Sequence, residues 1–548
     1  MLSQVRLLPL VLLGFMLCFA RSAAASHAQA GNLTYTSLGG NSYRVRVEFI
    51  RDCSGIAAPT SFALTCTTAC GATGTSTTLN VVGQPVIGTP YNSVLQPLAV
   101  CPLSGSAPTG ALANFAAYRY EGTVTLAPNQ WILSAEESVR PSVTNISAGT
   151  LRLEATLDNR ARTNNSVQFS SIPTIFIPVN QPNLLHIGAY DVDGDSLTYT
   201  LERPLNGCNT YETYSSYPST GCITRVDPQC PMRVINCTSA PSFYSPQLPI
   251  AVANDTIFEN GTTIRPACPT GSIVSATVRP RFSFSTTQGS FSFTPNRYLN
   301  TSSAQGDNKY AVVVKVTEWR RENGVYVAIG TTRRDMLWIV YNGGGNTLPR
   351  LAPTVTVQDG AQTRTQALNT AIPALAGEPV SVTFTASNPA ATTPIIYTLE
   401  QNTIPGAVIQ NNLVAGVGRL IFTPPLSMAN GTYNVSISVT DDAAPLRNLI
   451  TVPVSFRVYR GALATRRGSA QTIAAYPTPF TEAVQFQLPK PGSQGLTVFD
   501  QLGRVVTQLQ SQADGNVRWT PGPEVPAGLY SARSADGQFV VRLLRSAQ

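Results

Sequence analysis

Histidine and charge are scarce in this sequence of 548 residues. Charged residues make up 12% of the chain, and there are only two histidines, His27 and His186. A Ser-His-Asp triad would have to use His186, because His27 lies beside a leader-like N-terminus. The sequence also lacks a nucleophile elbow, a His-Glu-x-x-His motif and a glycine-rich phosphate loop. We therefore expect that the protein is not an enzyme.

Long helical patterns and long apolar runs are also missing from most of the chain. The sequence holds 41 Gly and 41 Pro and is rich in Thr and Ser. Short segments of alternating apolar and polar residues lie between these turn formers, which is typical of all-β modules. A chain of this length has room for roughly three to five domains.

The net charge is positive but diffuse. The formal charge is +8, and residues 1–25 contribute Arg6 and Arg21 and no acid, so the remainder carries 8 − 2 = +6. The other arginines are scattered, without a basic run or interleaved aromatic residues. This pattern argues against a nucleic-acid partner and favours an ordinary solvated surface.

Residues 1–25 have the pattern of a signal peptide. Arg6 precedes an apolar stretch at 7–17, and small residues allow cleavage after Ala25, with Ala30 as a second candidate. The apolar stretch is too short to span a bilayer, and no later segment approaches that length. We expect export to the periplasm and beyond, as a soluble protein.

The cysteines fall into two clusters, and none follows residue 268. Ten are present, and removal of Cys18 with the signal peptide leaves nine: Cys53, Cys66, Cys70, Cys101, and then Cys208, Cys222, Cys230, Cys237 and Cys268. In an exported protein we expect at least one disulfide within each cluster. The odd number leaves one thiol free or paired across the clusters. Zinc at Cys66 and Cys70 is disfavoured because no histidine is near.

Two stretches of the chain repeat one another. The strings "YTLE" (199–202), "FTP" (293–295) and "YAVVVKVTE" (310–318) recur in order as "YTLE" (397–400), "FTP" (422–424) and "YNVSISVTD" (433–441). The last string of each set alternates with period two, as a strand with one apolar face does. The repeat predicts two copies of one β-sandwich module, at 161–345 and 350–458.

The first copy carries a long insertion. "YTLE" and "FTP" begin 293 − 199 = 94 residues apart in the first copy and 422 − 397 = 25 apart in the second, so about 69 residues are added, roughly 203–285. All five cysteines of the second cluster lie there. A long segment without clear periodicity needs disulfides to become ordered, and such loops on a rigid scaffold often bind ligands.

Three acids stand at alternate positions in "DVDGDSLTYTLE" (191–202), namely Asp191, Asp193 and Asp195. The repeat offset of 397 − 199 = 198 places three uncharged residues opposite them: Pro389, Ala391 and Thr393. The second copy forms its strand without the acids, so the fold does not require them. Clustered carboxylates repel one another unless a cation or water relieves the repulsion.

Oxygen ligands at this spacing are those that calcium uses. An EF-hand is excluded, because Ser196 takes the position that needs glycine and the flanks alternate as strands. We predict instead a cadherin-like calcium turn at a module edge, to which Asp158 and Asn159 of the preceding strand add oxygens. The alternative is a solvated Asp-Gly turn without metal.

Residues 26–341 carry a family resemblance. Four strings occur in this order: "SHAQAGNLTYTSLGGNSYRVRVEFIRDCSG" (26–55), "NQPNLLHIGAYDVDGDSLTYTLERPL" (180–205), "FTP" (293–295) and "RRDMLWIVY" (333–341). In combination they resemble the N-terminal module of large Bacteroidota surface proteins, many of them labelled gliding-motility-associated. The resemblance implies a location at the cell surface.

The tail resembles a type IX secretion sorting domain. The matching positions in 476–548 are Tyr476, Pro477, Pro479, Phe480, Gly503, Arg504, Gly528 and Tyr530, with Thr478 where that family usually has Asn. The resemblance implies that a translocon reads this domain and that a sorting peptidase removes it and anchors the protein. The Arg- and Ala-rich segment 459–475 has the composition of an accessible linker.

Together these patterns predict an all-β chain of tandem antiparallel β-sandwich (Ig/cadherin-like) modules with a disulfide-rich insertion and a small β-sandwich tail. The expected parts are a signal peptide (1–25), an N-terminal module (26–160), two sandwiches (161–345 with its insert at 203–285, and 350–458), a linker (459–475) and the sorting domain (476–548). We expect a non-catalytic secreted or outer-membrane surface protein, adhesive or structural, with a glycan or protein ligand. The alternative is a carbohydrate-binding protein or polysaccharide hydrolase with its site in the insert; paired acids such as Glu136, Glu137 and Glu154 are interpreted as surface residues.

Overall fold

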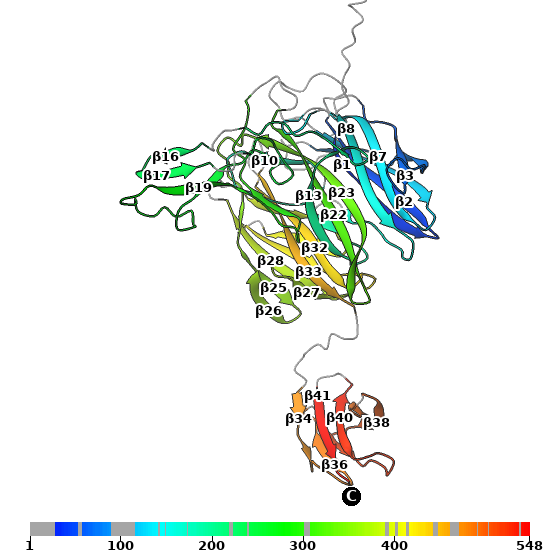
Figure 1. Ribbon diagram of the computed structural model, residues 1–548. Helices are drawn as coiled ribbons and strands as arrows, with labels where there is room; N and C mark the ends of the chain where they lie inside the picture. Colours follow the sequence, from blue (N-terminus) through cyan, green and yellow to red (C-terminus); the bar gives the residue numbers. More distant parts are fainter. Residues whose placement is uncertain are drawn as a thin grey trace, which may run out of the picture. The chain divides into compact units, whose positions relative to one another are not determined.

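The computed structural model has an all-β fold, as predicted. It describes residues 28–52, 57–88, 115–140, 143–147, 149–171, 174–218, 223–237, 241–300, 307–388, 394–399, 404–412, 416–441, 448–460, 471–489, 492–501, 503–535 and 539–547. These residues form strands joined by turns, without a helix among them (Figure 1). No segment within these ranges is a helix able to cross a membrane. The chain divides into two compact units, 1–461 and 462–548.

The N-terminal module is a sheet that closes on itself. Its strands are β1 (Ala28–Gly39), β2 (Ser42–Asp52), β3 (Ser61–Thr67), β4 (Thr75–Val81), β5 (Val86–Gly88), β6 (Phe115–Thr125), β7 (Gln130–Arg140) and β8 (Gly149–Asp158). They pair in the order β1-β2-β6-β4-β3-β7-β8-β23, and β23 (Val325–Tyr341) returns to β1. Alternate residues such as Phe62, Leu64 and Cys66 of β3 point into the core. The ring therefore needs a strand from far along the chain.

Strand β23 is shared by two modules. β22 (Lys309–Glu322) pairs with one edge of β23 along nearly its whole length. On the other side, β8 pairs with β23 at Gly330 and β10 (Thr174–Pro178) pairs with its last residues. A buried ion pair joins Arg140 of β7 to Asp335 of β23, with an Nη1–Oδ1 distance of 3.0 Å. The boundary predicted near residue 160 thus separates segments that lie in one continuous sheet.

The second module is a sandwich. One layer holds β10, β23, β22 and β13 (Ser196–Glu202), and the other holds β11 (Asn183–His186), β20 (Phe282–Phe284) and β21 (Ser290–Phe293). The pair β9 (Gln168–Phe169) and β12 (Ala189–Tyr190) lies beside them. The ring of the buried Trp338 lies 4.8 Å from that of Phe291 and stacks at 4.7 Å on Phe293, so aromatic packing joins the two layers.

The third module repeats this arrangement. Its two sheets contain β24 (Arg350–Leu351), β25 (Thr354–Asp359), β26 (Gln362–Ala367), β28 (Val380–Ser387), β30 (Ala407–Asn412) and β31 (Val417–Phe422), and then β27 (Ile372–Leu375), β29 (Ile395–Leu399), β32 (Gly431–Asp441) and β33 (Leu449–Tyr459). Tyr397 lies opposite Val439, just as Tyr199 lies opposite Val316 in the second module. The sequence repeat is therefore also a repeat of strand register.

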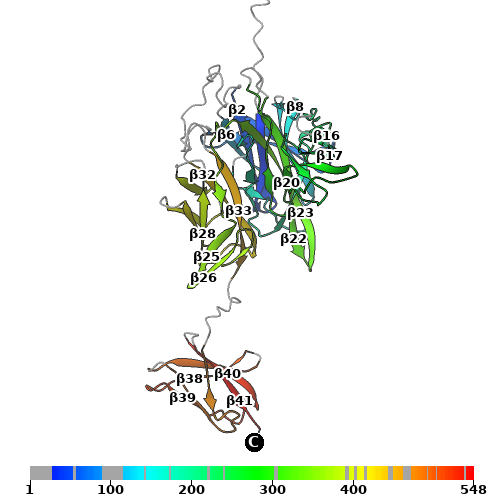
Figure 2. The same cartoon turned by 90° about the vertical axis from the view of Figure 1, so that its left-hand side faces the viewer.

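The second and third modules are joined by polar and apolar contacts. The backbone N–H of His186 donates to Thr451 Oγ1 at 2.7 Å, and the N–H of Leu348 donates to Gln181 Oε1 at 2.6 Å. Leu184 and Tyr190 of the second module pack against the core of the third. Figures 1 and 2 show β33 and β32 running beside the strands of the second module. These contacts make residues 28–460 one body.

The insert forms a small sheet of its own. Strands β16 (Arg225–Asp227), β17 (Cys230–Asn236), β19 (Val274–Pro280) and β18 (Asn254–Ile257) pair in this order, and the short hairpin β14 (Leu205–Gly207) and β15 (Thr210–Tyr211) precedes them. We call residues 223–237 and 254–280 the lobe, because the buried apolar residues between them belong to the core of the second sandwich. The lobe's own core cluster is small and contains the buried Ile235, Phe258, Ala276 and Val278. Such a core supplies little stability by itself.

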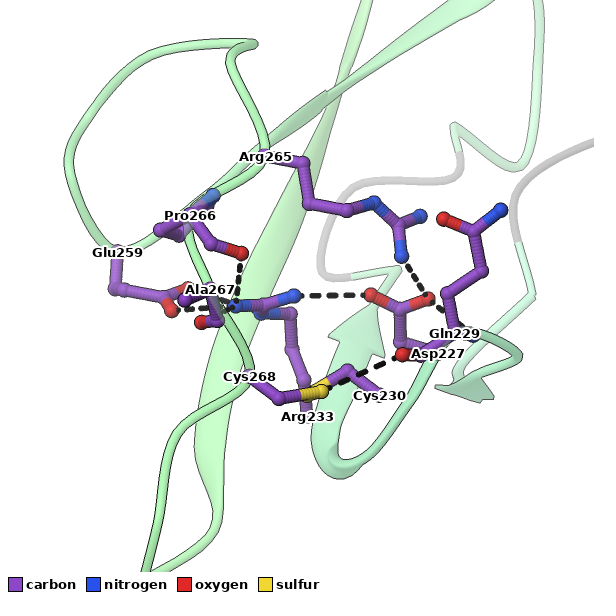
Figure 3. Close-up of a disulfide and its surroundings, with 9 residues drawn as sticks. All are labelled: Asp227, Gln229, Cys230, Arg233, Glu259, Arg265, Pro266, Ala267 and Cys268. Atoms are coloured by element: carbon purple, nitrogen blue, oxygen red, sulfur yellow. Dashed lines mark hydrogen bonds and ion pairs between the residues drawn. A yellow bond between two sulfur atoms is a disulfide. The ribbon is translucent and has the colours of Figure 1, made fainter.

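A disulfide and an ion-pair cluster hold the lobe together (Figure 3). Cys230 bonds Cys268. Beside them the buried Arg233 donates to Asp227 at 3.2 Å and to Glu259 at 2.8 Å, and Arg265 binds the other oxygen of Asp227 at 2.9 Å. Burial raises the pKa of Asp227, but the Gln229 N–H and the two guanidinium groups outweigh burial and hold it below its usual value. The insert is thus stapled, as its cysteine content predicts.

One disulfide joins the two sequence clusters of cysteines. Cys70 bonds Cys208 across 138 residues, which ties the N-terminal module to the start of the insert. Cys66 is buried without a disulfide, and burial raises the pKa of its thiol to about 12. Cys237 is also disulfide-bonded. Cys53, Cys101 and Cys222 lie outside the described residues. The bond between Cys70 and Cys208 joins the two clusters, and the expected bond within the first cluster stays a prediction for Cys53 and Cys101.

The C-terminal unit is a small sandwich. One sheet has the order β34 (Gln471–Ile473), β41 (Phe539–Arg545), β40 (Gly528–Ser534), β37 (Gly495–Phe499) and β38 (Val505–Gln510), and the other has β35 (Ala475–Tyr476), β36 (Val484–Gln487) and β39 (Asn516–Trp519). Its core includes Phe480, Trp519 and Tyr530. Strand β34 begins at residue 471, so the last part of the segment predicted as linker belongs to this fold.

His186 predicts a pH dependence of stability. Burial, with a further contribution from the charge of Arg334, lowers the pKa of His186 to about 3. The unfolded chain takes up a proton below the ordinary histidine pKa of about 6.5, whereas the folded chain does not, so stability falls as pH falls through that value. Between pH 7 and pH 5 the wild type should lose about 2 kcal/mol more than His186→Gln.

Denaturant unfolding of both proteins at pH 7 and pH 5 measures this difference. The comparison with the variant is needed because the carboxyl group of Asp191, whose pKa is raised to about 7, contributes a trend of opposite sign in both proteins. Equal pH dependence of the two proteins would contradict a buried neutral histidine.

Candidate metal centre

The three predicted acids lie together in the turn between β12 and β13. Ligand oxygens of Asp191, Asp193 and Asp195 all lie within 4.8 Å of one another. Asp191 Oδ1 accepts the backbone N–H groups of Asp193 at 2.8 Å and Asp195 at 3.0 Å. Gly194 completes the turn with φ of +83°, which side chains disfavour. The turn itself therefore aims the carboxylates at a common point.

A fourth acid, Glu318 on β22, was missed by the sequence analysis. It is fully buried, and its Oε2 accepts a long hydrogen bond of 3.5 Å from Asn164 Nδ2. Burial, followed by the charge of Asp191, raises the pKa of Glu318 well above its usual value. Burial, followed by the charge of Asp195, raises the pKa of Asp191 to about 7. Among the described residues no donor reaches Asp191 Oδ2 or Glu318 Oε1.

Arg320 neutralises one side of the cluster. Its Nε and Nη2 donate to the two oxygens of Asp195 at 2.9 and 2.6 Å, and Nη2 lies 3.2 Å from Asp193 Oδ2. Asn165 adds two donors to Asp193, from its backbone N–H at 2.9 Å and its Nδ2 at 2.7 Å. The Arg320 guanidinium thus forms ion pairs with Asp193 and Asp195, whereas no ion pair among the described residues involves Asp191 or Glu318. These two acids are where a proton or a metal ion fits.

The cluster lies where three modules meet. Asn164, which contacts Glu318, also donates to the hydroxyl of Tyr35 on β1 at 3.1 Å. On the other side, a Cβ atom built on Gly194 would lie 2.6 Å from the carbonyl oxygen of Asn430, in the turn before β32. A Cβ on Gly431 would lie 2.7 Å from the carbonyl oxygen of Gly194. The acidic turn therefore lies in close contact with the third module and is linked to the first module through Asn164.

The third module shows how amide donors satisfy the equivalent acid. In the repeat, Asp441 corresponds to Glu318 and is equally buried. Its carboxylate accepts Asn346 Nδ2 and Asn388 Nδ2, each at 2.9 Å, and the Asn448 N–H at 3.0 Å. Amide donors thus surround Asp441 in the third module, whereas in the second module a second acid, Asp191, lies close to Glu318. The residues opposite the acidic turn, Pro389, Ala391 and Thr393, lie outside the described residues.

Asp158 and Asn159 lie elsewhere. The carboxylate of Asp158 pairs with Arg160 at 2.7 and 2.9 Å, and this pairing lowers its pKa to about 2. Asn159 is used by its own module, where Oδ1 accepts the Asn129 N–H at 2.7 Å. The structure does not bring Asp158 into the group formed by the three turn acids. The position of Asp158 at a strand end did not reveal that its carboxylate forms an ion pair with Arg160.

The predicted sorting residues occupy two kinds of position in the C-terminal unit. Phe480 and Tyr530 are buried, and both contact the ring of Trp519. Tyr476 is 80% exposed, Gly503 turns with φ of +78°, and Arg504 pairs with Asp500 at 2.7 Å on the surface. Pro477 and Pro479 follow cis peptide bonds, and Gly528 begins β40. Some of these residues therefore build the core, and others face solvent.

Comparison with known proteins yields only distant structural likenesses. No protein-family model matches the chain, and no curated protein does. Among solved structures, Drosophila OTK extracellular domains 3–5 share 9% identity over 71% of this chain and 99% of that one, with a TM-score of 0.15. Protocadherin gamma B2 extracellular cadherin domains 3–6 share 12% identity over 70% and 74%, with a TM-score of 0.16.

An endo-fucoidan hydrolase of glycoside hydrolase family 107 is a further match, at 12% identity over 74% of this chain and 43% of that one, with a TM-score of 0.15. At these identities and TM-scores the likenesses assign this chain neither a ligand nor an activity. The assignments that follow rest on its own residues.

Proposed function

We propose that the protein is a non-catalytic secreted or cell-surface protein with a structural or adhesive role. The observation that carries the proposal is the continuous body of residues 28–460. Strand β23 serves two modules, and His186 and Thr451 join the second module to the third. Such a body suits the rigid presentation of a stapled lobe, because loops and insertions on a rigid scaffold commonly carry binding.

We further propose that the C-terminal unit is a type IX sorting domain. Its partners would be the translocon and a sorting peptidase, which leaves the body released or anchored at the outer surface. The unit has its own core and is separate from the body in the fold. That separation supports a signal that is read and removed without disturbing the rest.

The adhesive role is tested by coating beads with the purified protein and measuring their attachment to cells and to polysaccharide surfaces. Beads that carry a variant with residues 223–237 and 254–280 each replaced by a short glycine-serine loop serve as the comparison, because this variant keeps Tyr244, Ile250 and Val252 in the core of the second sandwich. We expect attachment that depends on the lobe and no release of reducing sugar. Sugar release that scales with protein concentration would contradict the non-catalytic assignment.

Calcium is the cation that fits the cluster best. The available ligand atoms are carboxylate oxygens of Asp191, Asp193, Asp195 and Glu318, which are the hard ligands that calcium takes. Two of these oxygens are buried without a donor among the described residues. A bound calcium would remove the repulsion between them and fasten the acidic turn between the first and third modules.

Calcium should therefore raise the thermal stability of the chain. At a hundredfold excess over the dissociation constant the gain is about 2.7 kcal/mol, and extracellular modules commonly need millimolar calcium. Glu318→Gln places an amide opposite Asp191, a pairing like that of Asn388 and Asp441 in the third module but with the amide and the acid exchanged. We expect this variant to be more stable than wild type in chelator and to lose the response to calcium.

Thermal unfolding at pH 7 in calcium and in chelator measures both effects. Asp158→Asn is the matched control, because Asp158 pairs with Arg160, and it should keep the full calcium response. A wild type that ignores calcium at millimolar concentration would show that Asp191 and Glu318 share a proton and that the turn holds no metal.

A further inference from the structure

A groove of about 620 Å³ lies where the lobe joins the second sandwich. Its walls come from the end of β19, the hairpin β20–β21, β18 and the preceding loop at Gln247 and Leu248. Arg281, between β19 and β20, is anchored on both sides: its N–H donates to the Ala253 carbonyl at 2.7 Å, and its carbonyl accepts the Thr294 N–H at 3.2 Å. The groove is thus built on fixed backbone, and its volume is typical of small-ligand sites.

The charge of the groove is positive. Asp255 and Arg279 are cross-strand neighbours on β18 and β19. Asp255 is neutralised by Arg281, at 2.5 Å, whereas no ion pair within the described ranges involves the exposed Arg279. Two guanidinium groups therefore face one carboxylate. Arg279 keeps its donors free, and a guanidinium binds carboxylate or sulfate oxygens in pairs.

Hydroxyl and amide groups surround these charges. Ser283 and Ser292 are exposed cross-strand neighbours on the hairpin, and the exposed Gln247 also lines the groove. Phe282 and Phe293 alternate with these serines, and their rings, with centroids 5.9 Å apart, pack toward the sandwich core and fix the hairpin. Short hydroxyls, an amide and a planar cation form a shallow polar site rather than a deep apolar pocket for a peptide side chain.

We propose that this groove binds an acidic saccharide, with Arg279 as the residue that pairs with its carboxylate or sulfate group. The hydroxyl groups of Ser283 and Ser292 and the amide of Gln247 form hydrogen bonds with the hydroxyls of the sugar. Arg281 holds Asp255 as an acceptor for a further hydroxyl. The proposal gives the ligand of the displayed lobe region a chemical class, and it rests on the adhesive role but not on the calcium site.

The test is binding of the full chain to three sets of oligosaccharides of matched length: polyuronates, sulfated galactans and neutral dextrins. We expect calorimetry to detect an acidic set and not the neutral one, and to show which acid group is preferred. Arg279→Gln should weaken binding at least tenfold. The matched control is Arg225→Gln, since Arg225 is also an exposed arginine of the lobe but does not line the groove.

Three outcomes would overturn the proposal: no binding of either acidic set, equal binding of the neutral set, or equal loss in both arginine variants. Equal binding of oligoglutamate would also overturn it, because the site would then accept any anion. Unaltered melting temperatures of both variants exclude misfolding. If Arg279→Gln abolishes saccharide binding but bead attachment persists, the adhesive role stands and this ligand assignment does not account for it.

Discussion

Removal of the C-terminal unit, residues 462–548, is expected to leave the protein in the periplasm. The unit carries all the predicted sorting residues, and it divides from the body as a compact unit. The C-terminal unit has a core built from its own residues only, so the body should still fold and accumulate when this unit is removed. Surface proteolysis of intact cells, with fractionation of the periplasm, measures the effect as a near-complete loss of surface protein.

Two point variants separate a folded signal from a short exposed motif. Phe480→Ala removes a buried ring that contacts Trp519, so it should unfold the small unit and abolish export. Tyr476→Ala alters a residue that is 80% exposed and should leave the unit folded. Loss of export in this variant too would place Tyr476 on the surface that is read. Equal surface exposure of full-length and truncated protein would contradict the sorting assignment.

The second large effect is expected from the disulfide between Cys70 and Cys208. It closes a loop of 138 residues between the N-terminal module and the insert. Cross-links over long loops reduce the entropy of the unfolded chain most, so the double variant Cys70→Ala/Cys208→Ala should lose about 2–5 kcal/mol of unfolding free energy. Denaturant unfolding of the oxidised protein measures this loss.

Cys66 provides the control for this experiment. Its thiol is buried and its pKa is raised to about 12, so it should resist alkylation in the folded protein and react only after unfolding. Cys66→Ala removes one sulfur from the core without breaking a cross-link and should be the milder change. A double variant as stable as Cys66→Ala, or native labelling of Cys66, would contradict the pairing.

Much of the fold is predictable because strand periodicity is local. The alternation in 310–318 and 433–441 correctly predicts which residues of β22 and β32 enter the sandwich cores, but several residues of the opposite face are buried too. The repeat of "YTLE" predicts that Tyr199 and Tyr397 occupy equivalent registers. The cysteine content of the insert predicts its staple. Each of these inferences needs only which residues alternate and how far apart similar strings lie.

The candidate site shows where this reasoning ends. Glu318 ends the same string whose alternation identifies β22, yet nothing in that string shows which residue faces it. Its position opposite Asp191 follows from the pairing of β13 with β22, in which Ser196 lies opposite Trp319. Asp158, which the sequence places at a strand end, is instead taken by its neighbour Arg160.

The sequence alone thus determined the strand class, the repeat, the insertion, the acidic turn and the two resemblances, because each is written in residues that are near one another or recur in order. Only the tertiary structure decided that β23 closes the first module, that Cys70 bonds Cys208, and that Glu318 and Arg320 meet the acidic turn. Periodicity specifies which face of a strand is buried, but it does not specify which distant strand covers that face. That choice depends on the path of the whole chain and on the packing that it permits.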